Sequence, residues 1–146
     1  MALVDRALAL NPSFARGWFY SGRIRLMAGQ PDLSIKHVEV SLRLSPRARV
    51  GFPFSVIGQA HFVSRRYETA VPNLLLAIQD DPTFPPGYRN LAACYAHMGR
   101  LDEARDVVRR LRAITPAVIS PNMPLRNPEH RDLLLSGLRL AMGGQT

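Results

Sequence analysis

Apolar residues recur along the chain in short stretches with helical spacing, and a proline ends each stretch. These prolines are Pro12, Pro46, Pro82 and Pro116, at spacings of 34, 36 and 34 residues. Because proline cannot continue a helix, each position marks the end of a predicted helix. The chain is therefore expected to consist of helices that repeat with this period.

Four further sets of positions follow the same period. They are an aromatic residue (Trp18, Phe54, Tyr88), a small residue four positions later (Gly22, Gly58, Ala92), a second small residue (Ser34, Ala70, Ala104) and a bulky aliphatic residue (Val38, Leu74, Val108). Small residues that face each other let two antiparallel helices approach closely, and the aromatic fills the gap toward the next pair. The pattern predicts stacked helical hairpins, none of which can bury its apolar face alone.

The hairpin turns are predicted near Gly29, Ser64-Arg65 and Gly99. Glycine is the usual residue where a helix ends in the left-handed conformation. Pro31 lies in the first turn of the helix that follows Gly29, where a missing N–H is harmless.

This pattern resembles the tetratricopeptide repeat, a helical hairpin of 34 residues with conserved aromatic, small and proline positions. Residues 88–104 match it best, whereas Ser21 and Arg25 stand in the first repeat where Leu and Tyr are usual. The resemblance implies an all-α superhelix, a solenoid of helical hairpins. It covers residues 1–116, as the second half of one repeat at 1–12 and repeats at about 15–46, 51–82 and 85–116.

The C-terminal part is expected to cap the solenoid. Residues 117–127 form a proline-rich connection, and Asn127 and Pro128 give a helix start at the head of a capping helix over 128–142. One face of this helix is apolar and is expected to dock on the helix over 101–114. It carries Leu133, Leu134, Gly137, Leu138 and Ala141. Residues 143–146 are expected to fray.

The N-terminal part matches only the second half of a repeat. An apolar stripe of Leu3, Val4, Ala7 and Leu8 is left without the preceding helix that would cover it. Two interpretations are open: the chain is a fragment of a longer protein, which we favour, or another chain covers the stripe. In either case the isolated chain is expected to dimerise through this helix, because apolar area of that kind seldom stays in contact with water.

The tail over 124–141 resembles the end of the tetratricopeptide region that follows the catalytic domain in many bacterial class III adenylate/guanylate cyclases. This resemblance implies the C-terminal regulatory region of a larger bacterial signalling protein. The cyclase catalytic motif does not occur in this sequence, so such a domain would lie upstream.

Composition and charge narrow the class of protein. The 146 residues are 47% hydrophobic, enough for one folded domain, and their formal net charge is +8. No apolar run approaches the ~20 residues of a membrane span. The start of the chain lacks a secretory signal, and one cysteine forms no internal disulfide. We therefore expect a cytoplasmic protein that does not bind membranes.

Nucleic-acid binding is not expected either. Arg105, Arg109 and Arg112 share one helix face, but Asp102 and Asp106 lie three or four residues from them. This is the pattern of a solvated helix with intrahelical ion pairs.

We find no catalytic motif, and so predict a non-enzymatic chain without a cofactor. A glycine-rich phosphate loop, a nucleophile elbow and a His-Glu-x-x-His pair do not occur in the sequence. Cys94 and His97 lie three apart on one helix, but a zinc site needs three or four ligands, so no metal is expected.

The first helix of each repeat lines the concave face in tetratricopeptide arrays, which makes this face the predicted binding groove. Its lining is predicted to be Arg16, Phe19, Tyr20, Arg23, Met27, Phe52, Ser55, Gln59, Phe62, Arg89, Asn90, Ala93 and His97. Arginines can hold carboxylates in paired hydrogen bonds while aromatics bury apolar side chains, so we expect an acidic, extended peptide. The alternative is that the groove packs against an upstream domain of the same chain.

Overall fold

The computed structural model describes residues 2–46 and 52–143. All of the regular secondary structure in these residues is α-helical. The helices are α1 (Ala2–Leu10), α2 (Ala15–Met27), α3 (Pro31–Leu44), α4 (Pro53–Val63), α5 (Tyr67–Asp80), α6 (Pro85–His97), α7 (Leu101–Arg112) and α8 (Pro128–Ala141). No helix among the described residues is long and apolar enough to cross a membrane. The residues 144–146 of the tail predicted to fray lie outside the described part.

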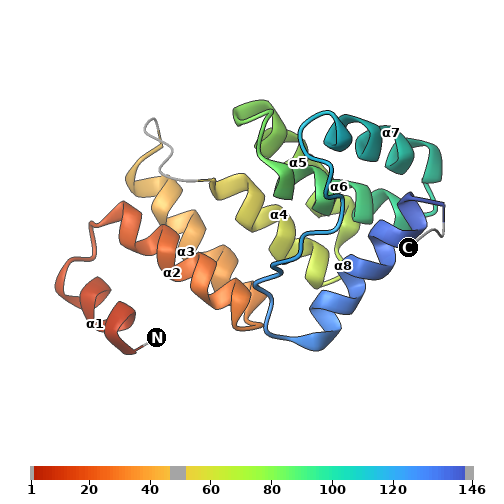
Figure 1. Cartoon of the computed structure of the whole chain (residues 1–146). Coiled ribbons are helices and arrows are strands. Elements are labelled where there is room, and N and C mark those ends of the chain that lie inside the picture. The colour runs from red at the N-terminus through yellow and green to blue at the C-terminus, as the bar shows by residue number, and fades with distance from the viewer. Residues whose placement is uncertain (1, 47–51, 144–146) are drawn as a thin grey trace.

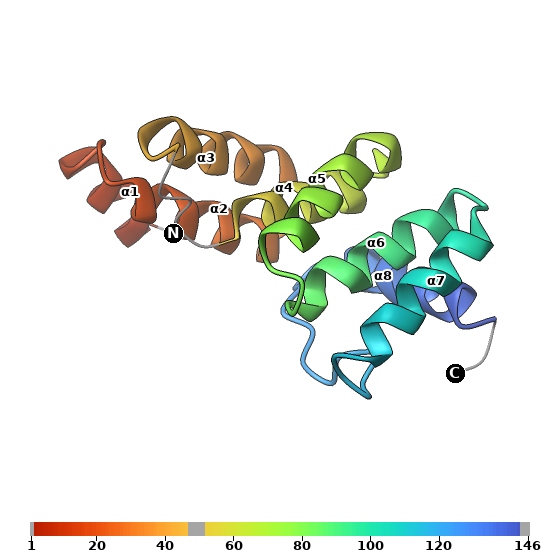
Figure 2. The same cartoon turned by 90° about the horizontal axis from the view of Figure 1, so that it is seen from above.

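Helices α2 to α7 form three consecutive hairpins, α2 with α3, α4 with α5 and α6 with α7. The hairpins stack in sequence order, because α3 packs on α4 and α5 packs on α6. Figures 1 and 2 show the successive pairs following one another from left to right along the stack. The predicted all-α solenoid is confirmed.

The hairpin turns lie where the sequence predicts them. Gly29 and Gly99 have positive φ values of 85° and 77°, and Arg65 takes the equivalent conformation at 61° in the second turn. After the first turn, the Gln30 N–H donates to the Arg25 carbonyl at 2.8 Å, which closes the end of α2. The second turn therefore holds a non-glycine residue in a conformation that favours glycine.

Close helix approach within the hairpins follows from the small residues. The Ser34 hydroxyl donates to the Gly22 carbonyl at 2.6 Å across the first hairpin. A Cβ atom at Gly58 would lie 2.6 Å from Cγ of Leu74, so a larger residue at this position would push α4 and α5 apart. Small residues at these positions thus set the distance between paired helices.

Two of the three aromatic positions, Trp18 and Tyr88, fasten their hairpins to the proline that follows the preceding helix. The Trp18 indole N–H donates to the Pro12 carbonyl at 2.8 Å, and the Tyr88 hydroxyl donates to the Pro82 carbonyl at 2.7 Å. Each bond gives a partner to a carbonyl that lies two residues beyond the end of the preceding helix.

The predicted docking of the C-terminal helix on residues 101–114 is wrong. α8 packs mainly on α6, with smaller contacts to α7 and α4, and so lies on the concave side of the stack (Figure 1). The apolar face itself is as predicted, since Leu134 and Leu138 are buried. The connection before α8, residues 117–127, is named the strap. It runs between α7 and α8 past the first helices of the hairpins.

The N-terminal stripe is covered more than predicted. Leu8 is buried against the first hairpin, so its expected exposure is wrong, whereas Leu3 and Leu10 are 83% and 80% exposed. Helix α1 packs on α2 alone among the described helices.

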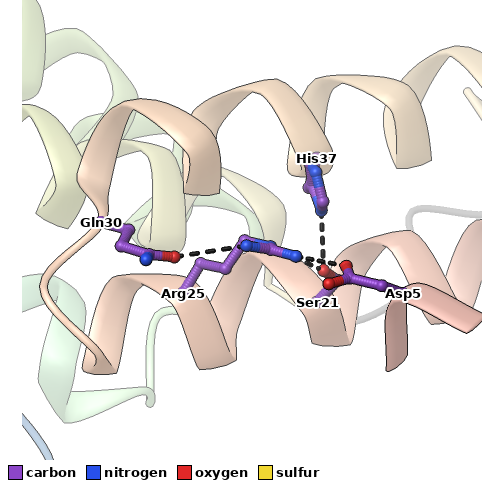
Figure 3. A network of polar contacts seen from close by, with 5 residues as sticks. All are labelled: Asp5, Ser21, Arg25, Gln30 and His37. Carbon is purple, nitrogen blue, oxygen red and sulfur yellow. Dashed lines mark hydrogen bonds and ion pairs between the residues drawn. The ribbon is translucent and has the colours of Figure 1, made fainter. Parts of the chain in front are cut away.

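A polar network holds α1 in place (Figure 3). The guanidinium of Arg25, buried in α2, forms an ion pair with Asp5 of α1 and hydrogen-bonds to Ser21 and Gln30. His37 of α3 shares a 2.7 Å hydrogen bond with the Ser21 hydroxyl. Ser21 and Arg25 are the two positions where the repeat pattern departs from Leu and Tyr, so polar contacts replace apolar packing here.

Candidate functional site

The concave side holds an open pocket with a volume of about 270 Å³. Its walls come from α2, α4 and α6 and from the strap, which crosses the concave side. The lining comprises Phe19, Arg23, Leu26, Met27, Phe52, Ser55, Val56, Gln59, Phe84, Pro86, Arg89, Asn90, Ser120, Asn122, Met123, Pro124, Leu125 and Leu134. This list combines predicted groove residues from all three first helices with residues that the sequence did not indicate.

The N-terminal part of the predicted groove is accessible. Arg16, Tyr20 and Arg23 are exposed on α2, and Met27 and Gln59 are half-buried. Arg23, Met27 and Gln59 line the pocket. These side chains are available for contact with a partner.

Arg89 is not the free cation that the sequence suggested. Its guanidinium donates to the carbonyls of Val118 and Ala117 at 2.9 and 2.8 Å, which fastens the start of the strap to α6. Burial lowers the pKa of Arg89 from its usual value. The donors that were expected to hold a ligand carboxylate are therefore used within the chain.

The C-terminal part of the predicted groove is covered by α8. The His97 ring nitrogen Nε2 lies 2.8 Å from the Leu133 carbonyl, and Phe62 is fully buried against Tyr67 and His97. Phe62 is consequently not part of an open groove floor. The engagement of His97 follows from the docking of α8, which no local sequence pattern specifies.

Four other predicted groove residues are buried: Phe19, Ser55, Asn90 and Ala93. Phe19, Ser55 and Asn90 are among the residues that line the pocket, and none of the four forms an exposed surface. The Asn90 side-chain N–H donates to the Pro86 carbonyl at 2.8 Å, and its Oδ1 is buried without a hydrogen-bond partner among the described residues.

Sequence reasoning predicted Phe52 at the groove but missed two features of the site. Phe84 stacks on Phe52 with the ring centroids 4.2 Å apart, and both residues line the pocket. Met123 and Leu125 of the strap form another wall, and Leu125 is buried. Apolar residues between the prolines of the strap were the available signal that this segment packs against the solenoid and is more than a linker.

The charged side chains that line the pocket are all positive. Of the described residues that line it, Arg23 and Arg89 are charged, and none is a carboxylate. The carboxylates that accompany the arginines of α7 lie elsewhere and form ion pairs there, Asp102 with Arg105 and Asp106 with Arg109. These pairs are the ones predicted from their spacing.

The candidate metal ligands do not form a cluster. Within the described residues, no group of three or more His, Cys, Asp and Glu side chains could hold a metal ion. Cys94 is fully buried in the core, and burial raises the pKa of its thiol to about 12. It is a packing residue with little thiolate character at neutral pH.

Comparison with known protein families gives two matches, each described as a tetratricopeptide repeat. They cover residues 2–49 and 64–119, together more than two thirds of the chain. A comparison with curated protein sequences gives no match.

Several solved structures share the fold. The crystal structure of MamA is similar with a TM-score of 0.71 and 19% identity, over 96% of this chain and 83% of that one. YrrB, described as a TPR protein with an unusual peptide-binding site, is similar with a TM-score of 0.65 and 22% identity, over 99% and 75%. The first TPR of Spaghetti (RPAP3), bound to the HSP90 peptide SRMEEVD, is similar with a TM-score of 0.63 and 18% identity, over 88% and 95%. At these identities the similarity establishes the fold.

Proposed function

Because this chain belongs to the tetratricopeptide-repeat family, we propose that it is a non-catalytic interaction module whose concave face binds a segment of another protein. Two of its structural neighbours are described with a bound peptide or a peptide-binding site. The single observation that carries the proposal is the open pocket between α2, α4 and the strap.

The charge of the face supports an acidic ligand. Arg16 and Arg23 are exposed on α2, and neither has an ion-pair partner among the described residues. A guanidinium binds a carboxylate with two parallel hydrogen bonds, and unpaired cations increase the association rate of an anionic segment at low salt. The ligand is therefore an acidic, extended segment with a large apolar residue.

The strap and α8 limit where this segment binds. Arg89, Phe62 and His97 are engaged within the chain, so the ligand contacts the part of the groove formed by α2 and α4. The binding surface consists of Arg16, Tyr20, Arg23, Met27, Phe52 and Gln59.

The segment belongs either to a separate protein or to an upstream domain of the same polypeptide. The second source includes the cyclase domain implied by the C-terminal resemblance, which stays a prediction. Both sources use the same surface, and the experiment below applies to both.

The test is a selection of peptides from a random display library against the full chain, followed by titration calorimetry. Arg23→Ala should weaken the selected peptides by at least about tenfold, because loss of a charge-assisted contact costs more than ~1.4 kcal/mol. Arg109→Ala on the outer helix is the matched control and should leave affinity unchanged. Equal losses in both variants, or a selection that returns no binders, would overturn the proposal.

A further inference from the structure

One face of α2 brings both an apolar wall and a cation to the pocket. Residues spaced as i, i+4, i+7 and i+8 share a helix face. Four residues with this spacing line the pocket: Phe19, Arg23, Leu26 and Met27. Phe19 and Leu26 are buried, whereas Arg23 is exposed. The helix therefore presents a guanidinium beside apolar surface.

The other walls of the pocket are largely apolar as well. Val56 of α4 and Leu125 of the strap are buried, and Met123 of the strap is half-buried. Two hairpins and the strap thus surround one space. This arrangement favours a compact ligand, because the strap crosses the concave side along which a longer ligand would run.

The size of the pocket also suits a small molecule. Its volume is about 270 Å³. A cavity of ~150 Å³ holds benzene, and pockets for drug-sized ligands span ~300–1,000 Å³. The space therefore fits the body of a molecule with one substituted ring or a medium-length alkyl chain.

The positive charge at the pocket has no counter-ion among the described residues. Arg23 and Arg89 form no ion pair there, and no described lining residue is a carboxylate. The carbonyls that accept from Arg89 occupy hydrogen-bond donors but carry no net charge, so they do not neutralise it. Such a site favours an anionic ligand over a neutral or cationic one.

We propose that the pocket binds a small monocarboxylate with an apolar body, an alkyl or aryl acid, whose carboxylate pairs with Arg23 while its body packs between α2, α4 and the strap. A guanidinium holds a carboxylate with two parallel hydrogen bonds. A second carboxylate on the ligand would lie against apolar walls without a partner. The inference goes beyond the peptide-binding function, because the ligand is a small molecule. Arg23 also belongs to the peptide surface, so the acid competes with the peptide there.

Octanoate is the test ligand, titrated into the full chain beside 1-octanol, octylammonium and acetate. We expect octanoate to bind about tenfold more tightly than 1-octanol, which lacks the charge, and octylammonium and acetate to bind more weakly than octanoate. Hexanoate should also bind about tenfold more weakly than octanoate, because two buried methylenes are removed. Added salt should weaken the binding of octanoate and not that of 1-octanol.

Methyl resonances followed by NMR locate the bound acid. Those of Met27, Val56 and Leu125 should shift as octanoate binds, since these residues line the pocket. Those of Leu3 and Leu10, which are exposed on α1, should stay unchanged. An alkyl chain that only covers exposed apolar surface would give the reverse pattern.

Two variants separate the charged head of the ligand from its apolar body. Arg23→Gln removes the charge at an exposed position, so the ratio of octanoate to 1-octanol affinity should fall from about ten to about one. Gln59→Trp places an indole in the pocket from α4 and should weaken both compounds. Arg109→Gln on the outer helix is the matched control and should change neither affinity. Because the first readout is a ratio, a general loss of stability does not reproduce it.

Equal affinity for octanoate and 1-octanol in the wild-type chain, an unchanged ratio in Arg23→Gln, or resonance shifts confined to α1 would refute the inference. Its failure is distinguishable from that of the proposed function. Octanoate binding with this ratio in a chain that selects no peptides would support the site and overturn the peptide-binding function. Peptides that depend on Arg23, without binding of octanoate, would overturn the site and leave the function standing.

Discussion

Gly137 in α8 lies directly against Ala93 in α6: a Cβ atom at position 137 would stand 2.7 Å from Cβ and 2.9 Å from Cα of Ala93. Real side chains do not approach this closely, so the position accepts no side chain without movement of a helix. This contact fixes α8 on the concave side of the stack.

Gly137→Leu should therefore detach or displace α8. We expect a loss of about 1–3 kcal/mol in the free energy of unfolding, the usual cost of overpacking, measured by urea denaturation. Hydrogen exchange should also increase in α8 and the strap. The matched control is Arg139→Leu at an exposed position of the same helix, which should change stability by less than ~0.5 kcal/mol. Equal stability of the two variants would contradict this docking of α8.

The ion pair between Asp5 and Arg25 should stabilise α1 on the first hairpin. Asp5→Ala leaves the guanidinium of Arg25, whose side chain is 9% exposed, without its carboxylate. Asp5 itself is half exposed, so we expect a cost of about 1–2 kcal/mol, below that of a fully buried pair.

The matched control is Asp106→Ala, which breaks an exposed pair with Arg109 and should cost less than ~0.5 kcal/mol. The double variant Asp5→Ala, Arg25→Met should recover part of the stability lost in Asp5→Ala, because no buried charge remains unpaired. A double variant less stable than Asp5→Ala would show that Arg25 acts through other contacts. Melting temperatures of the variants provide the measurement.

Acidification should destabilise the chain through its histidines. Burial lowers the pKa of His37 from its usual 6.5, and the positive charge of Arg25 lowers it further, while Asp5 partly offsets both. Burial is also the largest cause of the lowered pKa values of His61 and His130. The unfolded chain then binds more protons, so stability is fully present above about pH 6.5 and decreases as the pH falls below it.

The measurement is the melting temperature between about pH 7.5 and pH 5. His37→Gln should flatten this dependence by removing one of the three groups. A melting temperature that rises on acidification would be inconsistent with burial of neutral histidines.

The exposed leucines of α1 should cause self-association of the isolated chain. Leu3 and Leu10 are more than three quarters exposed, whereas Leu8 is buried and does not contribute. Sedimentation velocity should show a dimer whose population rises with concentration. The variant Leu3→Glu, Leu10→Glu should be monomeric, and Arg6→Glu on the same helix is the control for the added charge. An unchanged sedimentation profile in the double variant would exclude this surface.

The hairpins could be predicted from the sequence because their determinants are local. Gly29 and Gly99 end helices by their own backbone conformation, and Gly22 and Gly58 set the helix spacing within a hairpin of adjacent elements. Arg65 shows the limit of this reasoning, since its left-handed conformation is imposed by the turn and not by residue type.

The site was less predictable because it depends on contacts between distant segments. The pattern of α8 identifies an apolar face but not the helix that receives it, and either α6 or α7 offered small and apolar residues. Likewise the sequence shows a cation at Arg89 but not that the carbonyls of Ala117 and Val118 occupy its donors. The errors at Arg89 and His97 follow from this one segment, residues 117–141.

The strap has a consequence for how the chain folds. In a linear repeat array each unit contacts its neighbours alone, so terminal units can unfold independently. Here the Arg126 N–H donates to the Met27 carbonyl at 2.9 Å, which joins the last segment of the chain to the first hairpin. We expect this link to make the first hairpin and residues 117–141 unfold together, and to form late in folding because the entropy of closing so long a loop must be lost first.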